Sequence, residues 1–307
     1  MKTPIETHAY ATREDWLEAR RQGIGGSDAA AAVGESPWKS PFALWSEKVG
    51  LIEPDDLSNN EAVEWGHRLE QPIADAYAER SGRRVERHDT PFAITKNSEY
   101  PWMFATLDAV QFDSDRPDEP GVLQIKTTSA YHGDQWDDEP PLHYQIQLMH
   151  EIAVSGFTWG TLACLIGGQK LVWWDAERDD DFITLLIVRE KAFLELVQSE
   201  TPPTPDGSEQ TTAALKKLYP VDDGSIIELP PEAVAWDEQL VEAKAAEKAA
   251  KAVRDELENR IRAALGDAAE GRLPDGSAYS YKTQTTKYPA REATEKTFRV
   301  LRRRKAK

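Results

Sequence analysis

The chain has 307 residues, a formal net charge of −17, ten tryptophans and a single cysteine, Cys164. A hydrophobic fraction of 40% excludes a disordered chain, and one cysteine excludes a disulfide framework, a four-cysteine zinc site and a cysteine-ligated iron–sulfur cluster. The sequence shows no signal peptide and no long apolar span, so we expect a soluble, cytoplasmic protein with no membrane partner.

The charge is distributed unevenly. Residues 287–307 contain nine Lys or Arg and two Glu, a net charge of +7, which leaves −24 on the rest of the chain. Neutralising phosphates requires exposed basic residues, so this acidity argues against a general nucleic-acid binder. A narrow basic groove could still bind DNA while the remaining surface stays acidic.

A run of glycines separates the first two predicted helices, over residues 12–21 and 28–33. Ser27 is placed to cap the second helix. A glycine turn before a helix leaves backbone N–H groups that can bind a phosphate, and Arg20 and Arg21 lie just upstream. An ordinary helix cap explains the same residues, so both interpretations stay open.

Two amphipathic segments come next. Residues 36–50 predict a turn followed by a helix, and residues 61–80 predict a longer helix. Pro72 should bend the longer helix, because its ring clashes with the preceding turn. Short strands are expected over residues 83–87 and 92–96.

The stretch from Met103 to Thr128 carries the candidate chemistry. Its β-branched and aromatic residues predict two or three strands around a polar turn, with Asp108 interrupting the first run and Lys126 the second. A carboxylate can hold a divalent cation, and a nearby lysine can polarise the attacking water, so the pair suits metal-assisted hydrolysis. A cross-strand ion pair without catalytic function would also explain these two charges.

The remaining segments predict alternating loops, helices and strands, and then a different composition. They are a polar loop over residues 129–141, a helix over 143–155, a hairpin over 157–174, a helix over 182–198 and a Pro-rich segment over 201–207 that ends the regular structure of the first domain. From residue 230 the chain is rich in Ala, Glu and Lys and predicts one long amphipathic helix, a β-like run over 279–286 and a basic tail. We therefore expect a domain over residues 1–220 and a C-terminal arm over 221–307.

Five segments resemble YqaJ-like viral recombinases, which are related to lambda exonuclease within the PD-(D/E)xK restriction-endonuclease-like superfamily. They are RRQGIGGSDAAAAVG (20–34), WGHRLEQPIADAYAERSG (65–82), FATLDAV (104–110) with LQIKTTS (123–129), HYQIQLMHEIAVSG (143–156) and PDGSEQTTAALKKLYP (205–220). The resemblance implies a mixed α/β fold, in which helices flank a central sheet and a helical arm follows.

The resemblance also implies an active site. Its residues would be Glu70, Asp108, Gln124, Ile125 and Lys126. The two acids, the Gln124 amide oxygen and the Ile125 carbonyl would hold Mg²⁺ or Mn²⁺, and Lys126 would position and activate the water. The family usually has Glu where this chain has Gln124, and a neutral amide is a weaker ligand for a hard cation.

The DNA contacts that the resemblance implies come from two other segments. Arg21 and Ser27, beside Arg20, would hold the phosphate at a DNA end, and Gln145 would face the active site. The expected activity is a 5′-to-3′ exonuclease on duplex ends, with a single-strand annealing protein as partner and a homo-oligomeric ring as assembly, in a bacterial host. Because of Gln124, an inactive protein that binds DNA ends or serves as a scaffold stays open as an alternative.

Overall fold

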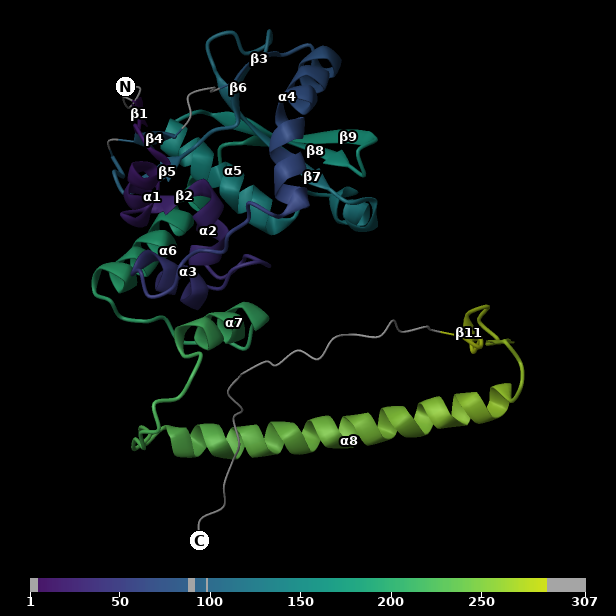
Figure 1. Cartoon of the computed structure of the whole chain (residues 1–307). Helices are drawn as coiled ribbons and strands as arrows, with labels where there is room; N and C mark the ends of the chain where they lie inside the picture. Colours follow the sequence, from purple (N-terminus) through teal and green to yellow (C-terminus); the bar gives the residue numbers. More distant parts are fainter. Residues whose placement is uncertain (1–4, 88–91, 98, 286–307) are drawn as a thin grey trace. The chain divides into compact units, whose positions relative to one another are not determined.

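The structure is a computed structural model that describes residues 5–87, 92–97 and 99–285 (Figure 1). It contains two compact units, Met1–Pro220 and Val221–Lys307. No helix in the described part of the chain is long and apolar enough to cross a membrane.

Two mixed β-sheets form the centre of the first unit. Their strands are β1 (Ile5–Ala9), β2 (Ile24–Gly25), β3 (Arg84–Arg87), β4 (Ala93–Asn97), β5 (Met103–Ala105), β6 (Ala109–Phe112), β7 (Gly121–Thr128), β8 (Trp159–Ile166) and β9 (Lys170–Glu177). One sheet has the order β3-β6-β7-β8-β9, in which β7 and β8 are parallel and the other neighbours antiparallel. The other has the order β1-β4-β5-β2, in which β2 and β5 are parallel.

The helices of the first unit pack on these sheets and on one another. They are α1 (Arg13–Arg21), α2 (Gly26–Ala32), α3 (Pro41–Lys48), α4 (Glu61–Ser81), α5 (Leu142–Ser155), α6 (Asp180–Gln198) and α7 (Glu209–Leu218), with a 3₁₀ helix, η1 (Ala130–Trp136). The helices predicted over residues 61–80, 143–155 and 182–198 are confirmed as α4, α5 and α6, within two residues at each end. Pro72 lies inside α4.

Side chains alternate across β7, and this alternation decides which of them face the site. Val122 packs in the cluster that contains the apolar face of α5, whereas Leu123 packs in the cluster that contains α4. Successive residues of a strand point to opposite faces, so Gln124 and Lys126 point to the same side as Val122. Gln124 and Lys126 therefore both face α5.

The predicted strand through residues 103–112 is broken where the sequence placed Asp108. β5 belongs to the smaller sheet and β6 to the larger, and Asp108 lies in the bend between them. A carboxylate needs polar partners that the middle of an apolar strand does not supply, which favours this break. The bend carries the chain from one sheet to the other and places Asp108 beside β7.

Two expectations about the loop segments are wrong. The segment 129–141 contains the 3₁₀ helix η1, because Trp136 is buried against Trp174 and Tyr144. Regular structure continues beyond the Pro-rich segment, since Ser208 caps α7 and α7 packs on α3.

The second helix begins at Gly26, one residue before Ser27, so that Ser27 lies in its first turn and does not cap it. The carboxylate of Asp28 instead accepts a hydrogen bond from the Gly25 N–H, at 3.3 Å. The start of α2 is thus fixed by Asp28 and leaves the Ser27 side chain available for other contacts.

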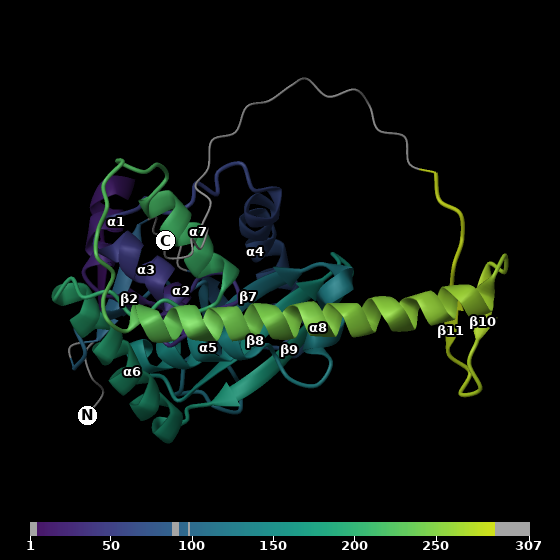
Figure 2. The same ribbon diagram turned by 90° about the horizontal axis from the view of Figure 1, so that it is seen from below.

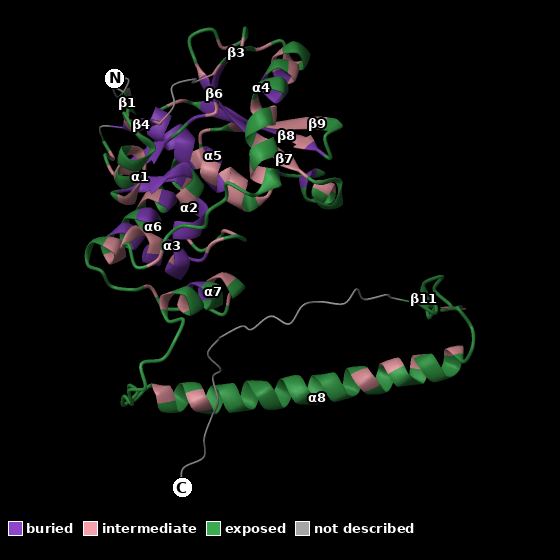
Figure 3. Cartoon of the chain, in the orientation of Figure 1, coloured by how far each residue is buried: buried purple, intermediate pink, exposed green. Residues whose placement is uncertain are grey.

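The regular structure in the described part of the second unit is one long helix and a hairpin. Helix α8 (Ala233–Leu265) is continuous over 33 residues, and none of its residues is buried (Figures 2 and 3). Strands β10 (Glu270–Arg272) and β11 (Ala278–Ser280) form the antiparallel hairpin. The predicted long helix is confirmed, and the basic tail from residue 287 lies outside the described residues.

Candidate active site

Asp108 accepts two hydrogen bonds from β7. Its Oδ2 receives the Gln124 side-chain amide at 2.6 Å and the Ile125 backbone N–H at 2.8 Å. Burial raises the pKa of this carboxyl to about 6, although Lys126 and the Ile125 N–H act in the opposite direction. At neutral pH the group is mainly ionised and can serve as a cation ligand.

Lys126 points toward α5. Its Nζ donates a hydrogen bond to the Oε1 of Gln147 at 2.9 Å and lies 4.9 Å from the centre of the Tyr144 ring. Gln147 in turn donates from Nε2 to the Oε1 of Glu151, also at 2.9 Å. The described contacts of Lys126 include no ion pair with Asp108, so a simple cross-strand ion pair does not describe this arrangement.

Glu70 reaches the same region from α4. Its carboxylate oxygens lie 3.0 Å from His67 Nδ1 and 3.0 Å from Arg87 Nη2. Glu70 also contributes to the raised pKa of Asp108 by repulsion between the two acids. Asp108 thus contacts Gln124 directly, and the charges of Glu70 and Lys126 both act on it.

Oxygen atoms suited to a hard cation are present beside Asp108. The Oε1 of Gln124 is buried and has no hydrogen-bond partner within the described structure. Leaving a buried carbonyl oxygen unpaired is costly, and a cation would satisfy it. Among the described residues no three His, Cys, Asp or Glu side chains are arranged to hold a metal, so amide and backbone oxygens would have to complete the ligand set.

In the segment predicted to bind a phosphate, Arg20 is hydrogen-bonded to Ser27. The Arg20 Nη2 donates to Ser27 Oγ at 2.8 Å, and its guanidinium lies over the rings of Trp16 and Phe104. Arg21 instead pairs with Glu18 at 3.3 Å. The structure therefore places Arg20 rather than Arg21 beside Ser27.

The start of α2 meets the active site at Gly26. A Cβ atom on Gly26 would lie 2.7 Å from the Oε1 of Glu151, which is too close for a real contact. A larger residue at this position would have to displace the Glu151 carboxyl. The predicted phosphate segment and the contacts of Lys126 therefore adjoin one another.

Of the two glutamines near the start of α5, Gln147 contacts Lys126. The side chain of Gln145 donates to the Pro140 carbonyl at 2.5 Å. Tyr144, Gln147 and Glu151 follow one another at helical spacings of three and four residues, and so share one face of α5. This spacing is visible in the sequence and would have indicated that Gln147 and Glu151 face the same side of α5.

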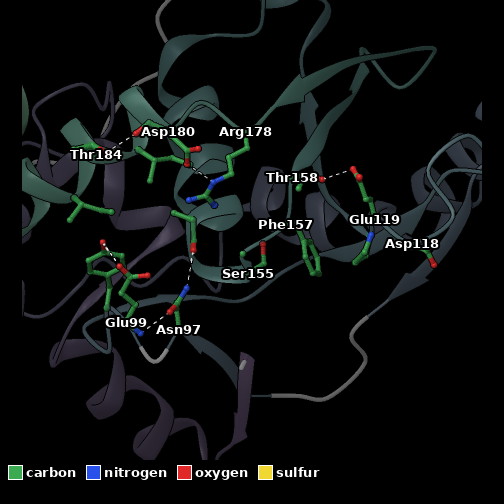
Figure 4. A pocket seen from close by; sticks show the side chains of 16 residues that line it. Asn97, Glu99, Asp118, Glu119, Ser155, Phe157, Thr158, Arg178, Asp180 and Thr184 are labelled. Atoms are coloured by element: carbon green, nitrogen blue, oxygen red, sulfur yellow. Dashed lines mark hydrogen bonds and ion pairs between the residues drawn. The ribbon is translucent and has the colours of Figure 1, made fainter. Parts of the chain in front are cut away.

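A cavity of about 700 Å³ lies elsewhere, beyond the C-terminal end of α5 (Figure 4). None of the predicted site residues lines it. Two pairs of its polar side chains are hydrogen-bonded, Arg178 with Asp180 at 2.6 Å and Thr158 with Glu119 at 2.9 Å. This cavity adds no chemistry to the site at Asp108.

The sheets and their flanking helices form a restriction-endonuclease-like fold, the fold of the alkaline exonucleases. Two crystal structures share it, LHK-Exo in complex with dAMP and the alkaline exonuclease LHK-Exo from Laribacter hongkongensis. Each covers 61% of this chain and 94% of its own, with a TM-score of 0.51 and 21% and 20% identity respectively.

Sequence comparison defines the family more narrowly. Residues 15–158 match the YqaJ-like viral recombinase domain. The chain is 35% identical over 272 residues to the protein YqaJ of Bacillus subtilis (strain 168). The aligned region covers 87% of this chain and 82% of that protein. The chain belongs to the YqaJ-like viral recombinase family.

Proposed function

We propose that this protein is a divalent-metal-dependent DNA exonuclease that acts on duplex ends in phage-type recombination. Membership of the YqaJ-like family and the fold of the alkaline exonucleases support a nuclease. The observation that carries the proposal is the arrangement around Asp108. This buried carboxylate lies beside the unpaired amide oxygen of Gln124, and Lys126 on the same strand is hydrogen-bonded to Gln147.

The residues divide into those that would hold a cation and those that would act on water. Asp108, Glu70, the Gln124 amide oxygen and the Ile125 carbonyl are the candidate ligands of Mg²⁺ or Mn²⁺. A bound divalent cation would supply Lewis-acid stabilisation of charge on the scissile phosphate. Lys126, fixed by Gln147, is placed to orient the attacking water and to offset negative charge as it develops.

The turn between α1 and α2 is the candidate seat for a terminal phosphate. Arg20 and Ser27 are already hydrogen-bonded to each other, whereas Arg21 is paired with Glu18 and would have to leave that contact to reach the phosphate. If this turn holds the 5′-terminal phosphate of a duplex, the enzyme should prefer DNA ends. It should then digest each strand in the 5′-to-3′ direction. Gln145 belongs to the proposed DNA surface. The proposed assembly is a homo-oligomeric ring, which acts with a single-strand annealing protein in the bacterial cytoplasm.

The test uses one end-labelled linear duplex and one covalently closed circular duplex of the same sequence. With Mg²⁺ the linear DNA should be shortened from its ends and the circle should survive, and EDTA should stop the reaction. Cleavage of the circle at a similar rate would indicate an endonuclease. Absence of cleavage with both Mg²⁺ and Mn²⁺ would contradict the proposed enzyme.

A second function has one specific observation in its favour. In the structure the Gln124 amide nitrogen, rather than a carboxylate, faces Asp108, so the site carries one negative charge fewer than it would with Glu. An inactive protein that binds DNA ends would retain binding of linear duplex in the same experiment without shortening it.

A further inference from the structure

Glu151 is a buried acid that the proposed chemistry does not yet use. Its side chain lies on α5, next to Gly26, and the residue is only 1% exposed. One carboxyl oxygen accepts the Gln147 amide at 2.9 Å, and the other, Oε2, has no hydrogen-bond partner in the described part of the molecule. Burying a carboxyl group is expensive, and an aliphatic side chain would pack here at lower cost.

The position of Glu151 determines which way the Gln147 amide faces. A lysine ammonium can only donate hydrogen bonds, so the Gln147 oxygen must face Lys126 for the contact to form. The amide nitrogen then points the opposite way and requires an acceptor, which Glu151 supplies. A protonated carboxyl keeps a carbonyl oxygen that can accept the same bond, so the arrangement holds in either state.

Without that acceptor nothing in these contacts would prevent the amide from turning over. The Gln147 NH₂ would then face the Lys126 ammonium, and two donors would oppose each other. Lys126 would lose its hydrogen bond to α5 while keeping its charge and its place on β7. The expected consequence is a misdirected lysine in an otherwise intact fold.

We propose that Glu151 is a positioning residue of the active site, which fixes the Gln147 amide so that its oxygen directs Lys126 toward the reacting phosphate. The inference rests on the proposed nuclease function. It assigns to Glu151 no contact with substrate or cation, because the hydrogen bonds that link it to Lys126 run through Gln147.

The central variant is Glu151→Leu, which removes the acceptor and nearly keeps the volume. The kcat for hydrolysis of linear duplex should fall by about 10- to 100-fold, as expected for a misplaced catalytic group, with an unchanged KM. Mg²⁺ affinity measured by calorimetry should also be unchanged. Glu151→Gln, which keeps an acceptor oxygen, should restore kcat to within about threefold of the wild type.

Two further variants separate positioning from a structural role. If Glu151 acts through Gln147, the double variant Gln147→Leu with Glu151→Leu should be no slower than Gln147→Leu alone. Glu190→Gln is the matched control, because Glu190 is equally buried and also has an unpartnered oxygen but is bonded to His150. Its kcat should match that of the wild type.

Gly26→Ala keeps the proposal testable if Glu151→Leu does not fold. A methyl group at this position presses on the Glu151 carboxyl and should lower kcat without changing Mg²⁺ affinity. An unchanged kcat in Glu151→Leu would overturn the inference. If Glu151→Leu is unfolded, an unchanged kcat in Gly26→Ala would overturn it. An additive loss of kcat in the double variant would also overturn it. Weaker Mg²⁺ binding in Glu151→Leu and Glu151→Gln alike would overturn it by making Glu151 a ligand. A wild type that cleaves no DNA would instead overturn the proposed function, on which the inference depends.

Discussion

Asp108 and Gln124 share a hydrogen bond, and the neutral amide at position 124 would give the proposed cation site one negative charge fewer than a glutamate. The amide nitrogen of Gln124 donates to Asp108 and its oxygen is left without a partner in the described structure. As a ligand this oxygen would be neutral, so the attraction of a divalent cation would depend on the two carboxylates of Asp108 and Glu70. We therefore expect the metal affinity of the proposed site to depend on residue 124.

Replacing Gln124 should change the metal requirement in a predictable way. Gln124→Glu adds a negative charge and should lower the Mg²⁺ concentration for half-maximal cleavage by about tenfold, a change of roughly 1.4 kcal/mol. Gln124→Leu removes the oxygen and should abolish cleavage. Both results are measured by titrating Mg²⁺ in cleavage assays on the same linear duplex. Gln135→Glu is the charge control, because Gln135 is exposed on η1.

Cleavage by Gln124→Leu at the wild-type rate would show that residue 124 is not a ligand. A wild type that is inert at every Mg²⁺ concentration, together with an active Gln124→Glu, would establish the alternative of an inactive DNA-end binder.

Glu151 should also make the stability of the fold depend on pH. Burial, followed by repulsion from Asp108, raises the pKa of its carboxyl from 4.5 to about 8. The folded state therefore binds this proton more tightly than the unfolded state does. The resulting stabilisation is fully present below about pH 4.5 and is lost as the pH rises through about 8.

Glu151→Gln has no such proton to lose, so its free energy of unfolding should exceed that of the wild type increasingly between pH 5 and pH 8. The gain at pH 8 should be about 1–3 kcal/mol, measured by urea denaturation in EDTA. Glu79→Gln, on an exposed turn of α4, is the control. A difference between Glu151→Gln and wild type that does not change with pH would show that Glu151 titrates normally.

Strand β7 and helix α5 together build the site, and the two were predictable to different degrees. Alternation along β7 follows directly from the sequence, so the pairing of Asp108 with residues of that strand could be expected. The direction of Gln145 was less predictable, because a shift of two residues along a helix rotates the side chain by about 200°. The structure places Gln147, and not Gln145, on the face that contacts Lys126.

The directions of the two arginines at the end of α1 also depend on tertiary contacts. The sequence favoured Arg21, but neighbouring helical residues point about 100° apart, and the direction of the final turn depends on tertiary contacts. Here Arg20 packs over Trp16 and Phe104 and reaches Ser27. The long helix α8 was predictable as an element, whereas η1 depended on burial of Trp136 against residues distant in sequence.

The turn between α1 and α2 should control the preference for a phosphorylated end. Linear duplex with a 5′-phosphate should be degraded faster than the same duplex with a 5′-hydroxyl, and Arg20→Ala should remove the difference. A charge-assisted hydrogen bond to phosphate contributes about 1.5–3 kcal/mol, so a preference of about tenfold or more is expected. Initial rates on the two substrates measure it.

Arg21→Ala in the same assay decides between the two arginines, and Arg80→Ala, on an exposed part of α4, serves as the control. If the preference survives in both Arg20→Ala and Arg21→Ala, the segment is an ordinary helix cap.

At the scale of the whole molecule, the described core lies entirely in the first unit. All of the described buried hydrophobic residues occur before residue 215, and α8 has none. The elements that carry Asp108, Lys126 and Glu151 belong to the same unit. The first unit therefore contains what the proposed fold and chemistry require.

A fragment of residues 1–220 should accordingly fold and cleave. Its thermal midpoint should lie within about 4 °C of that of the full chain, which corresponds to roughly 1 kcal/mol for a domain of this size. Its rate on short linear duplex should be within a few-fold of the full chain. Loss of cooperative unfolding, or a loss of cleavage greater than about tenfold, would show that residues 221–307 complete the domain.

The central claim is that Asp108 holds the cation and Lys126 performs the chemical step. The most direct measurement combines Mg²⁺ calorimetry with single-turnover cleavage of linear duplex for Asp108→Asn and Lys126→Met, with Lys170→Met on β9 as the control. Asp108→Asn should lose both Mg²⁺ binding and cleavage. Lys126→Met should retain Mg²⁺ binding while its cleavage rate falls by about 10²- to 10⁴-fold. Full cleavage in either variant would contradict the assignment of this site.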